Sequence, residues 1–304
     1  MKSMKTLNFS NFFNKSYDWK SIIYVIPVIA VLVFLDFYPI GVGVYFSFTN
    51  LNVIHFYNYS FIGFANYIAI LTSSAFPQII LHTIIWSVGS TVLMVPMGFA
   101  LALIINQKGL MGKRFYRTLI LFPWAYPAFI TLLIWKNMLS YHFGIINEVL
   151  NALGFKGLFW LGSPSLAMLS LILVNLWLSF PYYTYVFTAS IQSIPSELYD
   201  AAEMDGYGTL RTLRRITLPM LSRQFAFITI FGFIFTWNNF YPVFLLTGGG
   251  PLISTQILIT YSYYEAFTYL AYGVGIAYAI ISILILLVLV VLANKYTKMM
   301  QVLY

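Results

Sequence analysis

Apolar residues gather into six long runs along this chain, and shorter polar or turn-rich stretches separate them. An α-helix of about 20 residues crosses the ~30 Å hydrocarbon core of a bilayer, and each run is long enough to do so. The runs cover residues 21–48, 77–106, 115–139, 165–191, 225–246 and 272–293. The pattern predicts an all-α, polytopic membrane protein whose six transmembrane helices form one bundle.

The composition agrees with a bilayer environment. Hydrophobic residues make up 61% of the 304 positions and charged residues only 8%, against roughly 25% charged residues in an ordinary soluble domain. The first run follows four lysines and could also be a signal peptide. Its apolar region is long and lacks a small-residue cleavage site, so we expect an uncleaved anchor.

The distribution of lysine and arginine predicts the orientation of the helices. Only Lys136 and Lys156 fall on one side of the predicted bundle, and all other basic residues fall on the opposite side. These are Lys2, Lys5, Lys15, Lys20, Lys108, Lys113, Arg114, Arg117, Arg211, Arg214, Arg215, Arg223, Lys295 and Lys298. Because basic residues accumulate in cytoplasmic loops, we expect cytoplasmic flanks at 1–20 and 294–304, around a 21–293 domain in the cell (inner or plasma) membrane. Both termini would then be cytoplasmic.

No residue pattern predicts catalysis, a metal site or a bound cofactor. The absence of cysteine excludes disulfides, thiol catalysis and cysteine-ligated zinc. The three histidines are isolated, and the +8 net charge comes from separate short clusters rather than from a basic face for nucleic acid. The phosphate-binding pattern GxxxxGK[ST] does not occur, so the chain cannot hydrolyse ATP unaided.

Two segments outside the predicted spans have helical spacing. Residues 143–154 and 254–270 suggest short helices at the outer surface, and we favour a lid over the bundle rather than a docking site for a partner. The TGGGP stretch at 247–251 has glycines like a phosphate loop but lacks the lysine, and we interpret it as a turn.

Asp36 is the one acid well inside a predicted span. A proton-coupling carboxylate is one interpretation of such a residue. We instead expect an interfacial acid near the outer end of its helix, because Tyr38 and Pro39 follow it closely.

The segment PSELYDAAEMDGYGTLRTLRRITLPM, residues 195–220, concentrates charge within an otherwise apolar chain. It holds four of the eight acids and three of the sixteen basic residues. We expect a first short helix from Glu197 to Met204, with Ser196 as its N-cap and Gly206 ending it. A second short helix follows and breaks at Pro219. The segment is therefore predicted to be a cytosolic helix–turn–helix.

Small residues in the first of these helices suggest a contact with another protein. Ala201 and Ala202 would let a neighbouring surface approach closely, and Asp200 could pair with an arginine across that contact. Spacing alone leaves an alternative open, in which the loop is solvated and its charges only maintain the topology.

The same residues resemble the cytoplasmic signature of binding-protein-dependent ABC importer permeases, which reads E-A-A, three residues, G, nine residues, I-x-L-P. The matching positions are Asp200, Ala201, Ala202, Gly206, Ile216, Leu218 and Pro219, and the MDG stretch that includes Asp205 resembles the form common in sugar permeases. Aspartate replaces the usual glutamate at position 200 and keeps the charge on a shorter arm. The resemblance implies a coupling helix at about 196–206, within a cytoplasmic loop at about 192–222.

Other stretches resemble the carbohydrate-uptake subfamily, which includes the F-type permease subunits of maltose transport. They are YPIGVGVYFSFTN, FIGFANYIAIL, FYRTLILFPWAYP, LWLSFPYYTYVFTASIQSIP and WNNFYPVFLLTGGGP. The resemblance implies a type I importer fold, a sugar as substrate, and a second homologous permease. It also implies an extracellular or periplasmic solute-binding protein, and a dimer of ATPase subunits that binds ATP and Mg²⁺ and docks on the coupling helix. Glycerol phosphate or another polyol-like solute is the alternative substrate.

Polar and aromatic side chains inside the fourth and fifth predicted spans are candidates for the substrate pathway. They are Asn175, Trp177, Thr236, Trp237, Asn238, Asn239 and Tyr241. Amides can bind sugar hydroxyls, and aromatic faces can cover the apolar side of a sugar ring. We favour substrate contact for the pair Asn238 and Asn239, while hydrogen bonding between helices is the alternative for each residue.

Two other classes of function fit the sequence less well. A self-contained secondary transporter would show inverted repeats or coupling carboxylates and would not need the charged cytoplasmic signature. An intramembrane enzyme would need converging acids, histidines or a nucleophile within the spans, and only Asp36 is available there.

Overall fold

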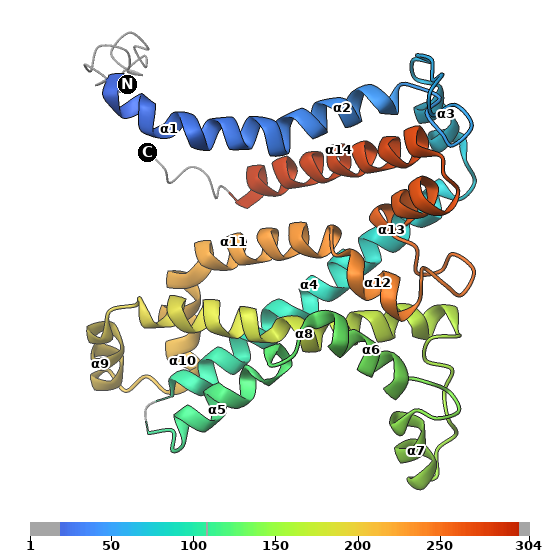
Figure 1. Cartoon of the computed structure of the whole chain (residues 1–304). Coiled ribbons are helices and arrows are strands. Elements are labelled where there is room, and N and C mark those ends of the chain that lie inside the picture. Colours follow the sequence, from blue (N-terminus) through green and yellow to red (C-terminus); the bar gives the residue numbers. More distant parts are fainter. Residues whose placement is uncertain (1–18, 108, 298–304) are drawn as a thin grey trace.

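The computed structural model describes residues 19–107 and 109–297, and its regular structure is helical apart from an isolated β-bridge between Thr49 and Phe61 (Figure 1). Among these residues, five helices are long and apolar enough to cross a membrane. They are Ile23–Ser47, Phe76–Asn106, Pro164–Gln192, Thr209–Trp237 and Tyr272–Lys295. The predicted flanks at 1–20 and 294–304 lie mostly outside the described residues.

The described residues form a succession of helices and short helical turns. In chain order they are α1 (Trp19–Leu32), the π-helical turn η2 (Val33–Phe37), α2 (Tyr38–Ser47), α3 (Ala65–Thr72), α4 (Phe76–Asn106), α5 (Lys113–Ile120), the 3-10 turn η3 (Phe122–Trp124), α6 (Ala128–Met138), α7 (Ile145–Ala152), α8 (Pro164–Gln192), α9 (Ser196–Met204), α10 (Thr209–Thr212), the π turn η4 (Leu213–Thr217), α11 (Leu218–Trp237), α12 (Phe240–Leu246), α13 (Leu258–Tyr263), the π turn η5 (Tyr264–Thr268) and α14 (Tyr272–Thr297).

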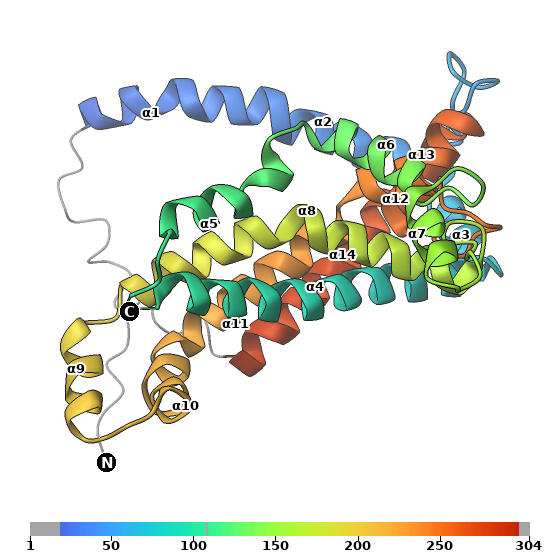
Figure 2. The same cartoon turned by 90° about the horizontal axis from the view of Figure 1, so that it is seen from below.

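The pair α4 and α8 forms the centre of the bundle, and α11 packs against α4 (Figures 1 and 2). Glycine permits the close approach of α4 to α8, because a Cβ added at Gly98 would lie 2.8 Å from the carbonyl carbon of Tyr183. The hydroxyl end of the same tyrosine lies against Gly232 of α11. Large side chains such as Trp86 and Phe187 are fully buried between these helices. The three helices therefore form a close-packed scaffold.

The third predicted span is interrupted, so the prediction of six continuous membrane-spanning helices is not confirmed. In its place the chain forms α5, η3 and α6, and α6 has only 11 residues, against the ~20 that a transmembrane helix needs. Pro123 and Pro127 cause the break, because proline lacks the N–H donor of a helix interior and disfavours helical geometry in the residue before it. Trp124 anchors the break to α8, since its Nε1 donates a hydrogen bond of 2.9 Å to the carbonyl of Leu178.

The fifth predicted span begins earlier than expected and is interrupted near its C-terminal end. It runs from Thr209 to Trp237 and resumes as α12 after two non-helical asparagines. The predicted break at Pro219 is wrong, because the π turn η4 precedes the proline and the N–H of Leu218 bonds to the carbonyl of Leu213. This wider turn accommodates a residue that has no N–H to donate.

The first span also contains a π turn just before a proline. The π turn η2 ends two residues before Pro39, as η4 ends two residues before Pro219. Beyond it, α2 packs against α14, where a Cβ added at Gly43 would lie 3.7 Å from Ile276. The most apolar window of the whole first span is 0% buried within the chain, and α1 lies at the edge of the fold in both views (Figures 1 and 2).

Asp36 lies in η2, near the middle of the membrane-spanning region rather than near its outer end. Because α2 and α14 run antiparallel and Gly43 is level with Ile276, a residue seven positions earlier is level with Ile283. That residue is at the centre of the span Tyr272–Lys295. The prediction of an interfacial acid is therefore wrong, because it relied on the nearby tyrosine and proline without knowing how deeply α2 enters the bundle.

The two segments that were predicted to lie at the outer surface form helices, as predicted. Helix α7 exposes Ile145 and Val149, whereas α13 is packed more deeply than a surface helix, with Leu258 and Thr260 fully buried. The TGGGP stretch at 247–251 is a turn, as interpreted from the sequence.

Candidate functional site

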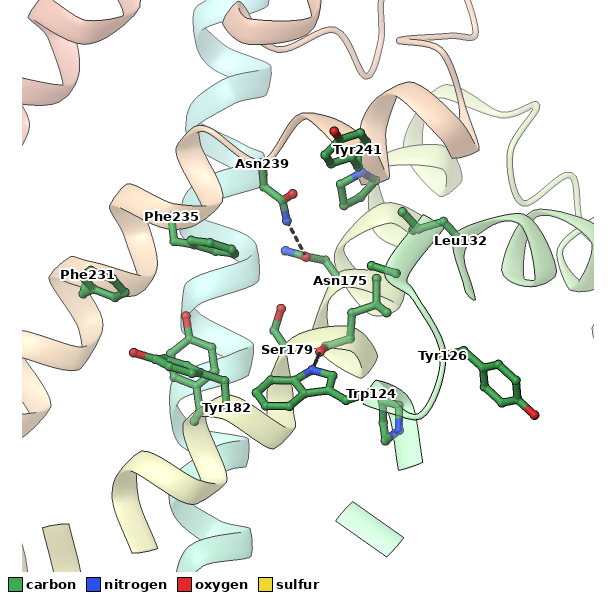
Figure 3. Close-up of a pocket in the computed structure, with 15 residues that line it drawn as sticks. Trp124, Tyr126, Leu132, Asn175, Ser179, Tyr182, Phe231, Phe235, Asn239 and Tyr241 are labelled. Carbon is green, nitrogen blue, oxygen red and sulfur yellow. Dashed lines mark hydrogen bonds between the residues drawn. The ribbon is translucent and has the colours of Figure 1, made fainter. Parts of the chain in front are cut away.

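A cavity of about 500 Å³ opens beside the middle of α8 (Figure 3). Its walls come from α6, α8, α11, the start of α12 and the break between η3 and α6. The lining residues are Pro123, Trp124, Tyr126, Ala128, Leu132, Asn175, Leu178, Ser179, Tyr182, Tyr183, Phe231, Phe235, Asn239, Tyr241 and Pro242. The cavity is therefore inside the helix bundle and not on one of its loops.

Two interrupted helices meet at this cavity. One interruption covers residues 121–127, between α5 and α6, and the other covers residues 238–239, between α11 and α12. Interrupted helices within a bilayer are tolerated where the irregular backbone lines a protein cavity, because elsewhere its polar groups would face lipid. In membrane transporters such breaks commonly surround the solute site.

The cavity wall is aromatic and carries no Asp, Glu, Lys, Arg or His. Seven of its side chains have aromatic rings, namely Trp124, Tyr126, Tyr182, Tyr183, Phe231, Phe235 and Tyr241. Two amides and one serine hydroxyl supply most of the remaining polar groups. This combination can cover an apolar face of a ligand and hydrogen-bond to uncharged hydroxyls.

The two amides form a hydrogen-bonded chain that leads away from the cavity. Nδ2 of Asn239 donates to Oδ1 of Asn175 at 3.2 Å (Figure 3). Nδ2 of Asn175 in turn donates to Oγ of Ser90 at 3.3 Å. Asn175 and Ser90 are buried, whereas Asn239 is partly exposed. The chain therefore fixes Asn239, and of the two amides only that of Asn239 retains exposed surface at the cavity.

The predicted pathway residues fall into two groups. Asn175, Asn239 and Tyr241 line the cavity, while Trp177, Trp237 and Asn238 do not. Hydrogen bonds or ring contacts within the chain account for the second group. Nε1 of Trp237 donates to Oγ of Ser282, Nδ2 of Asn238 donates to the carbonyl of Ile234, Trp177 contacts Trp135 edge to face, and the carbonyl of Thr236 accepts from Nε1 of Trp86.

Several lining residues were not predicted from the sequence. They include Trp124 and Tyr126 at the break, Ser179 and Tyr182 on α8, and Phe231 and Phe235 on α11. The two prolines of FPWAYP were the signal that could have located the first pair, because they predict an interrupted helix. The aromatic residues of α11 carry no such signal, since apolar side chains also face lipid.

The predicted coupling helix is present as α9. It begins at Ser196, one residue before the predicted start, with Pro195 as N-cap and no capping hydrogen bond from a side chain. Gly206 ends it at φ +71°, and the N–H of Tyr207 bonds to the carbonyl of Ala202 at 2.8 Å. This is the glycine-terminated helix end that the sequence predicted.

The two alanines of α9 have opposite environments. Ala201 is exposed, together with Asp200 and Asp205, whereas Ala202 is only 4% exposed and faces the rest of the chain. The hydroxyl of Tyr199 lies 3.2 Å from Oγ1 of Thr217 and ties α9 to η4. The exposed face of α9 is therefore held in place by contacts on its other face.

The remaining signature residues lie on the continuous helix that follows. Ile216 is half-buried in η4, and Leu218 and Pro219 begin α11. Arg211 of α10 stacks over the ring of Tyr207 at 4.0 Å, which packs the turn between α9 and α10. The signature residues of α9 and η4 are therefore joined to the helix that carries Phe231 and Phe235 and that ends at the break beside the cavity.

Known proteins similar to this chain are transport permeases. It is 37% identical over 78% of its length to the galactooligosaccharides transport system permease protein GanP of Bacillus subtilis (strain 168). It is 35% identical over 74% of its length to the maltose/maltodextrin transport system permease protein MalF of Vibrio vulnificus (strain YJ016). The match covers 60% of the first relative and 45% of the second, so the chain spans about half of the length of these relatives.

A solved structure and a family model agree on the fold and the family. A chain of a bacterial ABC transporter involved in the import of the acidic polysaccharide alginate is similar in fold, with a TM-score of 0.82 and 24% sequence identity, over 93% of this chain and 96% of that one. The family model described as "Binding-protein-dependent transport system inner membrane component" matches residues 94–300. The family that the cytoplasmic signature predicted is therefore confirmed, and this chain belongs to the inner membrane components of binding-protein-dependent transport systems.

Proposed function

We propose that this chain is the permease subunit of an ATP-driven importer and forms half of the translocation pathway for a neutral sugar. The observation that carries this proposal is the uncharged aromatic cavity at two helix breaks, in a chain that also carries the family's coupling signature. The similar permeases named for galactooligosaccharides and maltodextrin support a sugar as the substrate class.

The chemistry of the cavity favours an uncharged substrate. A phosphate or carboxylate group inside a membrane protein needs a cationic partner or several N–H donors, because burial of an unpaired charge is very costly. No cationic side chain lines the cavity. Glycerol phosphate is therefore less favoured than an oligosaccharide or a neutral polyol, for which amide, hydroxyl and aromatic groups suffice.

The energy for transport would come from a separate ATPase dimer. No GxxxxGK[ST] sequence is present, so ATP and Mg²⁺ would bind the partner and not this chain. The exposed face of α9, around Asp200 and Ala201, would seat in that subunit. Closure of the ATPase dimer would then move α11, which is continuous with the coupling segment, and reshape the cavity.

The complete importer would contain further subunits. We infer a second homologous permease, and a solute-binding protein on the outer side that delivers the sugar. One structure of the alginate transporter contains an alginate pentasaccharide-bound periplasmic protein, which supports this arrangement for a protein of the same fold. With the broken third span and the five long helices, the chain would cross the cell membrane six times, so both termini would lie on the same side. The distribution of basic residues predicts that this side is the cytoplasm.

Reconstitution tests the proposal directly. The chain would be co-expressed with the second permease, the ATPase and the solute-binding protein encoded with it, and the complex placed in liposomes. Neutral oligosaccharides, an acidic oligosaccharide and glycerol phosphate would then be compared as stimulators of vanadate-sensitive ATP hydrolysis and uptake. We expect stimulation by a neutral oligosaccharide. Stimulation by glycerol phosphate alone would contradict a neutral sugar, and uptake that needs no ATPase would contradict the importer and favour a secondary transporter.

A further inference from the structure

The carboxyl group of Asp36 is exposed on the outside of the chain at mid-membrane depth. Asp36 lies in η2, level with Ile283 at the centre of the last span. Among the residues that the structure describes, no hydrogen bond or ion pair to this carboxyl group is found. The cavity is lined by other helices and does not include it.

The surroundings of Asp36 within the chain cannot satisfy the carboxyl group. The flanking side chains Phe34, Leu35 and Phe37 are apolar and between 66% and 71% exposed. The most apolar window of this span contains no buried residue, and η2 contacts chiefly α1 and α2 of the same span. An acidic side chain in hydrocarbon is costly, and such residues normally face a protein interior or a polar partner.

The depth of Asp36 in the membrane limits which groups can donate a hydrogen bond to its carboxyl group. Lipid acyl chains have no hydrogen-bond donor, and an ATPase or a solute-binding protein lies outside the hydrocarbon region. A donor at this depth must therefore come from another membrane-embedded segment. Side chains on a transmembrane helix that can donate such a bond include those of Ser, Thr, Asn, Gln, Tyr, Trp, His, Lys and Arg.

We propose that Asp36 is an intersubunit contact, whose carboxyl group accepts a hydrogen bond from a transmembrane helix of the second permease subunit. The inference rests on the proposed function, because that function supplies the second permease. The uncovered face of the first span, Ile23–Ser47, is then the surface on which the second subunit packs, and Asp36 fixes its register.

Assembly of the two permeases tests this role. Asp36→Leu removes the acceptor and makes the helix more apolar, so failure to insert in the membrane would not explain a defect. We expect the amount of second permease that co-purifies in detergent to fall by ~3- to 30-fold, as for the loss of one interhelical hydrogen bond. Asp36→Asn keeps an acceptor and should retain most of the assembly. Leu35→Ala, at the neighbouring and similarly exposed position, measures the loss that comes from apolar packing on the same face, and it should lower co-purification less than Asp36→Leu does.

Cross-linking supplies a second readout that does not alter Asp36. The chain has no cysteine, so Leu35→Cys or Phe37→Cys gives a unique site for a benzophenone maleimide in the complete complex. We expect photo-cross-links to the second permease. Cross-links only to lipid, or only to a second copy of this chain, would overturn the proposal.

The remaining outcomes are also decisive. Normal assembly of Asp36→Leu would overturn the proposal, even where its uptake is lost. If Asp36→Asn and Asp36→Leu both assemble normally and both stop uptake, the carboxyl group serves proton transfer instead. A wild-type complex without ATP-dependent uptake would contradict the proposed function, whereas normal wild-type uptake with an unaffected Asp36→Leu would contradict only the intersubunit contact.

Discussion

Nδ2 of Asn239 donates a hydrogen bond of 3.2 Å to Oδ1 of Asn175 and so joins the break between α11 and α12 to the centre of α8. The second amide is itself held by Ser90 of α4. Side-chain hydrogen bonds thereby connect α4, α8 and the break between α11 and α12 beside the cavity. A movement of α11 that separates this pair would change the polar groups presented to a solute.

Replacement of Asn239 should raise the KM for substrate uptake with little effect on folding. Its amide is partly exposed at the cavity, and one hydrogen bond contributes roughly 0.5–1.5 kcal/mol. We expect Asn239→Ala to raise the KM for uptake by ~2- to 10-fold in liposomes that contain the whole complex. Asn238→Ala is the control, because that amide bonds to the carbonyl of Ile234 away from the cavity. Equal KM changes in both variants would contradict the assignment.

Replacement of Asn175 should affect stability as well as uptake. The side chain is 1% exposed and bonds to both neighbours in the chain of amides. Asn175→Ala leaves the buried hydroxyl of Ser90 and the partly exposed amide of Asn239 without this partner, and an unsatisfied buried polar group costs about 1–3 kcal/mol. We expect a lower melting temperature of the purified complex than for Asn239→Ala, measured by the same thermal assay. An unchanged melting temperature would argue against the buried hydrogen bonds.

Replacement by aspartate should have different effects at the two alanines of α9. Ala201 is exposed and Ala202 is buried. We expect Ala201→Asp to leave the fold intact but lower co-purification of the ATPase by at least about tenfold, since it places an unpaired charge in the contact. Ala202→Asp should destabilise the chain itself by about 3 kcal/mol or more. Thermal stability and co-purification separate the two effects, and normal ATPase binding by Ala201→Asp would contradict docking on this face.

Gly206 should be more sensitive to substitution than its neighbour Gly208. Gly206 has φ +71° and its N–H bonds to the carbonyl of Glu203, whereas Gly208 has φ −72°. Proline requires a φ near about −65° and has no N–H. We expect Gly206→Pro to remain in the membrane but to lose uptake and coupled ATP hydrolysis, and Gly206→Ala to cost about 1 kcal/mol. Gly208→Ala is the control, because its backbone is compatible with alanine and no atom lies within 4 Å of the added Cβ.

Glu265, in η5 between α13 and α14, should make the stability of the chain depend on pH. Burial raises the pKa of its carboxyl group, and a hydrogen bond from Tyr261 opposes that shift. The folded state therefore holds the proton at a higher pH than the unfolded state does, so the favourable contribution is present below about pH 4.5 and decreases as pH rises through the folded pKa. We expect Glu265→Gln to have a higher melting temperature than wild type at pH 7.5, and we expect this difference to be smaller at pH 4.5. Glu148→Gln, at an exposed outer glutamate, is the control.

The features that were predictable from the sequence are those set by local chemistry. Helix α9 and its end at Gly206 follow from short-range propensities, and most long helices follow from apolar runs. The break at residues 121–127 was missed because an apolar run gives the length of a span without its continuity. The roles of Asn238 and Asn239 differ although they are adjacent, because the end of α11 turns one amide back to its own helix and the other towards α8. Such a difference depends on tertiary geometry.

The most direct test of the account is accumulation of a neutral oligosaccharide against its gradient in liposomes, with and without the ATPase subunit. The two permeases, the solute-binding protein and ATP would be present in both samples. We predict that uphill accumulation occurs only with the ATPase and disappears with vanadate. Uphill accumulation by the permeases alone would contradict the claim that this chain is a passage driven by a partner.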